Sequence, residues 1–189
     1  GGAGFIGSHL AEELVKSYQV VVIDDLSSGK LENIQHLMGN ENFEFVRGSI
    51  TNLNLLKEVF KDAECVFHQA AIASVQKSIE DPLAVNEVNA TGTLNVLIAA
   101  RDCGVRKVIY ASSAAVYGDL EPPLKEDMRP NPKSPYAVSK LAGEYYCKVF
   151  SEIYGLKTIS LRYFNIYGPR QDPSSEYAAV IPRFISRLL

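Results

Sequence analysis

Short runs of apolar residues alternate along the chain with longer stretches of helical periodicity. The apolar runs, rich in β-branched residues, are residues 20–23, 43–46, 65–67, 108–110 and 158–161. Continuous runs of this length are typical of strands that are buried on both faces of a parallel sheet. Helical patterns occupy residues 8–18, 53–60, 82–103, 134–153 and 181–189. The alternation predicts an α/β fold with a doubly wound, Rossmann-like parallel sheet and right-handed crossovers.

Composition and charge narrow the choice of partners. The 189 residues are 47% apolar and 22% charged, with a formal net charge of −3, so bulk charge gives no basis for binding nucleic acid. No apolar run reaches the roughly 20 residues that a membrane span needs. Cys65, Cys103 and Cys147 lie far apart among apolar neighbours, so we expect small buried side chains in a cytoplasmic, reducing environment and no metal site.

A glycine-rich turn opens the chain and precedes the first helical pattern. Gly1, Gly4 and Gly7 are spaced GxxGxxG, and Gly2 completes a GxGxxG pattern. Such glycines let backbone amides approach a pyrophosphate, which the positive end of the following helix favours. Asp24 ends the next predicted strand, where a carboxylate accepts hydrogen bonds from the adenosine ribose and repels a 2′-phosphate. The turn and Asp24 together predict a site for NAD rather than NADP.

The position of this turn also affects the expected domain organisation. A strand normally precedes such a turn, whereas here the glycines come first. We therefore expect the fold to lack its first strand in this chain and most of a C-terminal substrate domain. On this interpretation residues 1–165 form an N-terminally truncated NAD-binding domain, and residues 166–189 begin the substrate-binding region.

Three side chains further along are suited to proton transfer. Ser113 follows a predicted strand, and Tyr136 and Lys140 share one face of a helix because they are four positions apart. A free phenol, with a pKa of about 10, is a poor base at neutral pH. A nearby lysine cation, oxidised nicotinamide and the helix N-terminus all favour the phenolate, and Ser113 can hydrogen-bond the same substrate oxygen. Downstream of an NAD site, the three residues predict a redox enzyme.

These motifs together resemble the extended short-chain dehydrogenase/reductases, and among them the NAD-dependent nucleotide-sugar epimerases and dehydratases. The matching stretches follow the family's order over nearly the whole chain: residues 1–10, 20–29, 68–71, 89–97, 110–119, 134–140 and 161–173. The similarity is greatest to 4-epimerases of UDP-glucose or UDP-N-acetylglucosamine. It implies an isomerase that epimerises a UDP-hexose at C4 through a transient 4-keto sugar.

The resemblance also assigns roles to individual positions. It places the turn glycines at the pyrophosphate and Asp24 at the ribose. Its further cofactor-binding residues are Phe5, Ile6, Ser49, Ile50, Ala70, Ala71, Asn89, Ser112, Tyr136, Lys140 and Tyr163. Its catalytic residues are Ser113, Tyr136 and Lys140, and its substrate-binding residues are Ser113, Tyr136, Phe164 and Asn165.

The chain departs from its relatives at two places. Ser49 stands where many relatives carry an aspartate that contacts adenine, and a hydroxyl is a weaker acceptor than a carboxylate. Ala114 and Ala115 stand where related dehydratases and decarboxylases carry acidic residues, and alanine transfers no proton. The alanines favour a simple redox step at C4. Three alternatives remain: a UDP-glucuronate 4-epimerase, another nucleotide-sugar oxidoreductase, and a catalytically silent NAD(H)-binding subunit.

Two helices carry apolar residues beyond those that one sheet needs. These residues are Val88, Leu94, Leu97 and Ile98 in the first helix, and Val138, Leu141, Tyr145 and Val149 in the second. In relatives the corresponding helices form a four-helix bundle with a second subunit. The resemblance thus implies a homodimer through residues 82–103 and 135–153, and residues 172–182 resemble a substrate-side loop.

Overall fold

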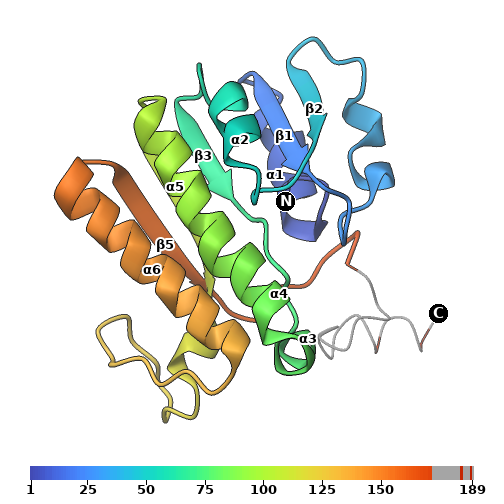
Figure 1. Ribbon diagram of the computed structural model, residues 1–189. Helices are drawn as coiled ribbons and strands as arrows, with labels where there is room; N and C mark the ends of the chain where they lie inside the picture. Colours follow the sequence, from blue (N-terminus) through green and yellow to red (C-terminus); the bar gives the residue numbers. More distant parts are fainter. Residues whose placement is uncertain (172–183, 185–187, 189) are drawn as a thin grey trace. The chain divides into compact units, whose positions relative to one another are not determined.

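The computed structural model describes residues 1–171, 184 and 188, shown as a ribbon in Figure 1. The chain forms two compact units, and each is described by itself. One comprises Gly1–Ser49 with Phe164–Leu189, and the other comprises Ile50–Tyr163. The loop expected at residues 172–182 lies outside the described residues, as does the helix expected at residues 181–189 apart from residues 184 and 188. The domain boundary expected at residue 165 stays a prediction.

The first unit contains the glycine-rich turn, the helix after it and a two-stranded sheet. Its elements are α1 (Phe5–Leu14), β1 (Val20–Asp24), β2 (Phe43–Arg47) and two 3₁₀ turns, Leu31–Asn33 and Gln35–Leu37. The strands are parallel, with Asp24 opposite Arg47 at their carboxyl ends. The core of this unit is apolar and consists of Ala3, Ala11, Val15, Val22, Ile34 and Leu37. Burial of this cluster fixes α1 against β1.

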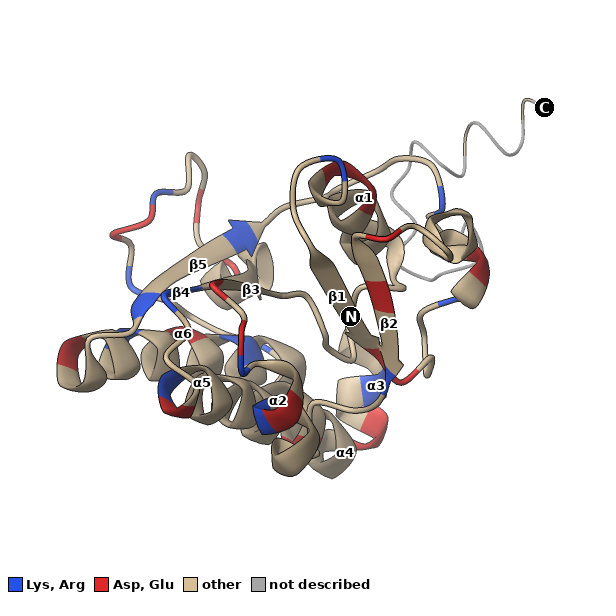
Figure 2. Ribbon diagram, turned by 90° about the horizontal axis from the view of Figure 1, so that it is seen from above, with Lys and Arg blue, Asp and Glu red and all other residues tan. Residues whose placement is uncertain are grey.

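The second unit contains a three-stranded parallel sheet in the order β3-β4-β5. Its strands are β3 (Cys65–His68), β4 (Lys107–Ser113) and β5 (Lys157–Tyr163), and its helices are α2 (Leu53–Val59), α3 (Val75–Glu80), α4 (Pro82–Asn86), α5 (Gly92–Asp102) and α6 (Pro135–Tyr154). Helices α5 and α6 lie side by side on one face of the sheet (Figures 1 and 2). Parallel strands joined through helices confirm the predicted Rossmann-like α/β class.

Several elements differ in detail from the sequence-based prediction. The helix expected over residues 82–103 is divided into α4 and α5 by a π-helical turn, Glu87–Thr91. Helix α3 was not predicted because six residues are too few to show a clear helical period. The expectation of three buried cysteines is wrong for Cys65, which is exposed, and Cys103 is half-buried. Within the part of the chain that the structure describes, no helix has the length and apolarity to cross a bilayer.

Helix α6 packs unusually close to the sheet. It begins at Ser134, whose hydroxyl accepts a hydrogen bond from the Ala137 amide, and Pro135 occupies its first turn. On the buried side, a Cβ at Gly143 would lie 2.3 Å from the hydroxyl oxygen of Tyr110 in β4. That hydroxyl instead donates to the carbonyl oxygen of Lys140 at 3.3 Å. The glycine therefore sets how near the helix lies to β4.

Candidate functional site

The predicted site residues fall into two groups, one in each unit. In the first unit, the glycine-rich turn is closed by a hydrogen bond from the Gly4 amide to the Gly1 carbonyl at 3.4 Å. A Cβ on Gly7 would lie 2.2 Å from that carbonyl oxygen, so Gly7 lets α1 approach the turn. A Cβ on Gly4 would meet only the same oxygen, at 3.4 Å, which is ordinary contact. The structure thus gives Gly7 a packing role and leaves Gly4 without one.

The N-terminus of α1 has the features that favour binding of an anion. Helix α1 starts at Phe5 after an extended Gly4, and among the described residues no side chain caps it and its first turn carries no acidic residue. The amides of the first turn, which include those of Phe5 and Ile6, lack partners inside the helix and lie at its positive end. They are suited to hold the pyrophosphate of a dinucleotide.

Asp24 is buried at the carboxyl end of β1, and its carboxylate is held by the backbone. One oxygen accepts the Ala3 amide and the other the Leu26 amide, both at 2.9 Å. A carboxylate has about four acceptor positions, so capacity remains for ribose hydroxyls. A Cβ on Gly29 would lie 2.7 Å from this carboxylate, so the loop at Gly29 packs directly against it. The role of Gly29 was missed by the sequence reasoning, although its position in a glycine-ended loop after Asp24 was a usable signal.

The segment with Phe164 and Asn165 belongs to the same unit, and both residues are exposed. The residues after it are docked on α1. Arg170 hydrogen-bonds Glu12 and the Ser8 hydroxyl, and the His9 Nε2 lies 3.0 Å from the Pro169 carbonyl oxygen, as for an N–H donor. These contacts join the predicted substrate-binding segment to the helix of the predicted pyrophosphate site.

In the second unit, the end of β4 and the start of α6 carry the three predicted catalytic residues. The Ser113 hydroxyl oxygen accepts the Ala115 amide at 3.1 Å. Tyr136 lies in the first turn of α6 and is half-buried. Lys140, one turn later, donates from Nζ to the Ala111 carbonyl at 2.8 Å, and its ammonium lies 6.0 Å from the centre of the Tyr136 ring. The cation and the phenol therefore lie near one another, as the spacing predicts.

Burial lowers the pKa of two groups in this region. Lys140 is almost fully buried, and loss of hydration lowers the pKa of its ammonium from 10.5 to about 8. The lysine is thus still mainly protonated at neutral pH, where its charge favours the phenolate of Tyr136. Burial lowers the pKa of His68 at the end of β3 to about 3, so this histidine is neutral and unsuited to act as a general acid.

Asn89 lies in the π-helical turn, and its side chain serves the chain itself. Its amide oxygen accepts the Ile72 amide at 2.8 Å, while its NH₂ donates to the Ile72 carbonyl and, at 3.1 Å, to the Ser139 hydroxyl. It thereby holds the loop after Ala70 and Ala71, both half-buried, against α6. Irregular turns of this kind are frequent at functional sites. Direct cofactor contact by Asn89 stays a prediction.

The other predicted cofactor residues have varied surroundings. Ser49 is half-buried in the first unit. Ile50 is buried against Gly92 of α5. The Tyr163 hydroxyl accepts a hydrogen bond from Gln69 at 3.3 Å. The Ser112 hydroxyl donates to Glu144 and is buried, so only its backbone is left to meet a cofactor.

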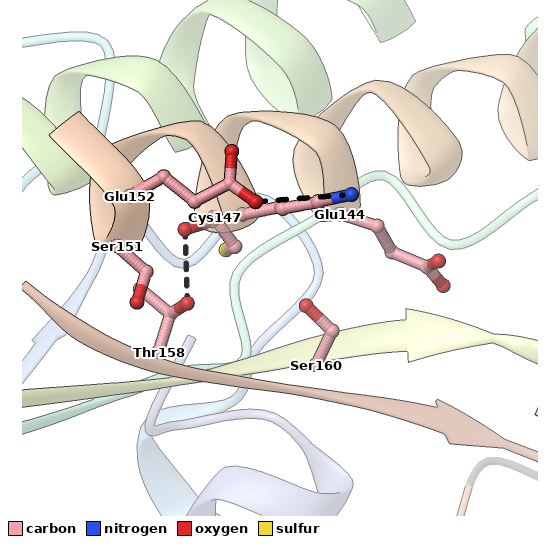
Figure 3. Close-up of a pocket in the computed structure, with 7 residues that line it drawn as sticks. Glu144, Cys147, Ser151, Glu152, Thr158 and Ser160 are labelled. Atoms are coloured by element: carbon pink, nitrogen blue, oxygen red, sulfur yellow. Dashed lines mark hydrogen bonds and ion pairs between the residues drawn. The ribbon is translucent and has the colours of Figure 1, made fainter.

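A pocket of about 330 Å³ between α6 and β5 contains none of the predicted site residues. It is lined by Glu144, Cys147, Lys148, Ser151, Glu152, Thr158 and Ser160 (Figure 3). Lys148 pairs with Glu152, and Thr158 donates to the Cys147 carbonyl, so these polar groups already bind one another. Across the described residues, no cluster of three or more histidine, cysteine or acidic side chains could hold a metal ion.

Comparison with known proteins gives consistent matches along the whole chain. The model of the NAD dependent epimerase/dehydratase family matches residues 1–189. A UDP-glucose 4-epimerase of Mycolicibacterium smegmatis is 44% identical, and the alignment covers 100% of this chain and 61% of that protein.

Two solved structures are similarly close. A UDP-N-acetylglucosamine 4-epimerase of Methanobrevibacter ruminantium has a TM-score of 0.94 and 46% identity, with 99% of this chain and 60% of that chain covered. A Thermus thermophilus UDP-glucose 4-epimerase in complex with NAD has a TM-score of 0.87 and 44% identity, with coverage of 96% and 58%. The chain thus spans about three fifths of the length of these relatives.

Proposed function

The chain belongs to the NAD dependent epimerase/dehydratase family, and from this membership we propose that its protein epimerises a UDP-hexose at C4. The observation that carries the proposal is the geometry at the start of α6, where the buried ammonium of Lys140 lies 6.0 Å from the centre of the Tyr136 ring. Family membership confirms the resemblance found in the sequence, and NAD is the family's cofactor. The identity of the hexose and of its substituents is part of the proposal and not of the family assignment.

The residues present fit NAD. The uncapped first turn of α1 is suited to the pyrophosphate, and Asp24 retains acceptor capacity for the ribose. A buried carboxylate at this position disfavours a 2′-phosphate, so NADP fits less well. When bound, NAD⁺ supplies a hydride acceptor for C4 of the sugar and afterwards a donor to the opposite face of the same carbon.

The residues of the second unit supply the proton transfers. Tyr136, as the phenolate, takes the proton of the C4 hydroxyl while the C4–H bond breaks. Lys140 stabilises that phenolate by its charge, and the Ser113 hydroxyl hydrogen-bonds the C4 oxygen. After the 4-keto sugar has turned over in the site, Tyr136 returns the proton to the same oxygen. The proton and the hydride are both restored, so the product differs from the substrate only in configuration.

Ala114 and Ala115 support epimerisation over elimination. They follow Ser113 in a 3₁₀ turn, Ala114–Tyr117, so the two positions after this serine carry only methyl groups. Elimination of water needs an acid that protonates the leaving hydroxyl. The alanines cannot supply that proton, which leaves Tyr136 of α6 as the proton carrier that we propose.

Interconversion of UDP-sugars by the full-length protein tests the proposal. We expect UDP-glucose and UDP-galactose, or their N-acetyl forms, to interconvert without added NAD and without net formation of NADH. Conversion of UDP-glucuronate alone would support the uronate-specific alternative, and net NADH formation would indicate an oxidoreductase. Bound nucleotide with no turnover of any UDP-sugar would contradict the proposal and favour a silent NAD(H)-binding subunit.

We also propose a homodimer through the outer faces of α4, α5 and α6. Val138, Tyr145, Val149 and Ile153 are exposed and follow a helical stripe along α6, and Leu83 of α4 is also exposed. Leu97 does not contribute to this surface, because it is fully buried against its own unit. Uncovered apolar stripes of this kind mark protein–protein contacts.

Sedimentation of a charged variant tests the dimer. In Val149→Glu, a carboxylate would be buried at the interface without a partner, so we expect dissociation to monomers at micromolar concentration. Lys148→Glu, one position away and already exposed, is the matched control and should remain dimeric. A wild-type protein that sediments as a monomer would refute the dimer.

The state of the cysteines indicates the cellular compartment in which the protein works. All three are free, as in proteins of reducing compartments, and we propose that the protein works in the cytoplasm.

A further inference from the structure

An ion pair between α6 and β5 lies close to the predicted catalytic residues. Arg162 Nε donates to Glu144 Oε1 at 2.9 Å, and Arg162 Nη2 donates to Glu144 Oε2 at 2.8 Å. The side chains are only 16% and 13% exposed, respectively. This is the two-pronged geometry that a guanidinium and a carboxylate form best. It fixes the direction of both side chains as well as their distance.

Further contacts hold both members of the pair. The Ser112 hydroxyl of β4 donates to Glu144 Oε1, so the carboxylate joins α6 to β4 and β5. The Arg162 guanidinium lies 4.6 Å from the ring centre of Tyr117, and its Nη1 donates to the Glu126 carbonyl at 3.3 Å. The hydrogen bonds to Glu144 raise the pKa of Arg162 above its ordinary value, so the guanidinium keeps its charge.

Each member of this network is next to a predicted site residue. Ser112 directly precedes Ser113, and Arg162 directly precedes Tyr163. Glu144 lies one helical turn after Lys140. The Lys140 ammonium donates a hydrogen bond to the carbonyl oxygen of Ala111, the residue before Ser112. The ends of β4 and β5 and the first half of α6 are therefore tied to one carboxylate.

We propose that Glu144 and Arg162 are positioning residues that hold Ser113, Lys140 and Tyr163 in register for the redox step. The proposal rests on the proposed function, since it assigns a role in that reaction. A buried ion pair is weak evidence for stability, because apolar side chains of similar volume fill such a site as well or better. A two-pronged pair does fix orientation, and small displacements of catalytic groups cost rate steeply.

Lysine in place of arginine separates charge from geometry. Arg162→Lys keeps the cation but loses the planar fork that binds both oxygens of Glu144. We expect kcat to fall by about tenfold to a hundredfold, while the KM for the UDP-sugar changes by less than about threefold. Glu144→Gln should give the same pattern. Rates are measured well below the unfolding temperature of each variant and per bound nucleotide.

The matched control is Glu152→Gln on the same helix. Glu152 pairs with Lys148 at 3.8 Å, but both side chains are largely exposed, so the loss of this pair should leave kcat and KM unchanged. If Glu152→Gln lowers kcat as much as Glu144→Gln does, loss of any carboxylate on α6 has the same effect, and the positioning role is refuted.

Amide hydrogen exchange gives a readout that does not depend on turnover. In Arg162→Lys, exchange should accelerate at residues 111–115 and 136–140 and stay unchanged in β1 and β2. A merely structural pair would instead raise exchange throughout the second unit. If the wild-type protein converts no UDP-sugar, the proposed function is wrong. Amide exchange would still show whether the pair of Glu144 and Arg162 holds residues 111–115 and 136–140 in place. Unchanged exchange there, or a kcat within about twofold of wild type, overturns the positioning role.

Discussion

Tyr136→Phe is expected to lower kcat for UDP-sugar epimerisation by about a thousandfold, within the range that a positioned acid–base group contributes. Phenylalanine keeps the ring in the first turn of α6 but has no oxygen to take the C4 proton. Ser134 caps the N-terminus of helix α6, and the substitution leaves this cap intact. The fold and the nucleotide content should therefore be unaffected. The KM should stay within about threefold, because mainly transition-state stabilisation is removed.

The control for this variant is Tyr146→Phe, which removes a phenol from the surface of the same helix. It should turn over like the wild type. Initial rates with UDP-galactose, normalised to bound nucleotide, give both comparisons. Normal turnover by Tyr136→Phe would show that another group carries the proton, and the mechanism proposed for α6 would be wrong.

Gly7→Ala is expected to weaken nucleotide binding by at least about tenfold and to destabilise the first unit by about 3 kcal/mol, the upper part of the usual range for overpacking. The added Cβ would lie 2.2 Å from the Gly1 carbonyl oxygen and 2.7 Å from the Gly2 Cα. Both atoms are backbone, so the clash is relieved only by moving α1 away from the turn. The first-turn amides, which we propose to hold the pyrophosphate, would move with it. Titration with NADH and chemical denaturation measure the two effects.

Gly4→Ala separates ligand binding from packing in the same turn. Its Cβ would meet only the Gly1 carbonyl oxygen at 3.4 Å, and Gly4 has a negative φ that alanine adopts readily. We therefore expect wild-type stability and weaker binding of NADH, because the methyl group occupies the space that a pyrophosphate needs. Equal affinity in wild type, Gly4→Ala and Gly7→Ala would show that the turn does not bind the cofactor.

The sequence reveals the positions of the strands well, because short runs of β-branched and aromatic residues favour an extended backbone. The expected burial on both faces is wrong for β1, β3 and β5, in which Val21, Phe67 and Ile159 are exposed. The run at residues 108–110 is the middle of β4, but the strand continues to Ser113. Small and polar residues at the end of a strand show no apolar pattern, although the proposed catalytic Ser113 is among them. The division of residues 82–103 is hidden for another reason. Asn89, in the π-helical turn, hydrogen-bonds Ile72 and Ser139, and contacts between residues so distant in sequence leave no local pattern.

For the candidate site, local patterns identify the ends of elements but not the partners of each side chain. The i, i+4 spacing was enough to bring Tyr136 and Lys140 together. It gave no role to Glu144 or Arg162, whose partners come from other elements. A signal was present, since Arg162 directly follows the apolar run of a predicted strand, and a largely buried charge requires a counter-charge. Finding that counter-charge required the register of β4, β5 and α6.

The close approach of α6 to β4 at Gly143 limits how this protein can be redesigned. Because any side chain there meets the Tyr110 ring, the spacing of the helix and sheet layers cannot be widened without displacing Tyr136 and Lys140 together. Libraries that seek new sugar specificity should therefore leave this contact unchanged and vary the exposed segment at Phe164 and Asn165. Loops on a rigid scaffold tolerate such change far better than a helix–sheet contact does.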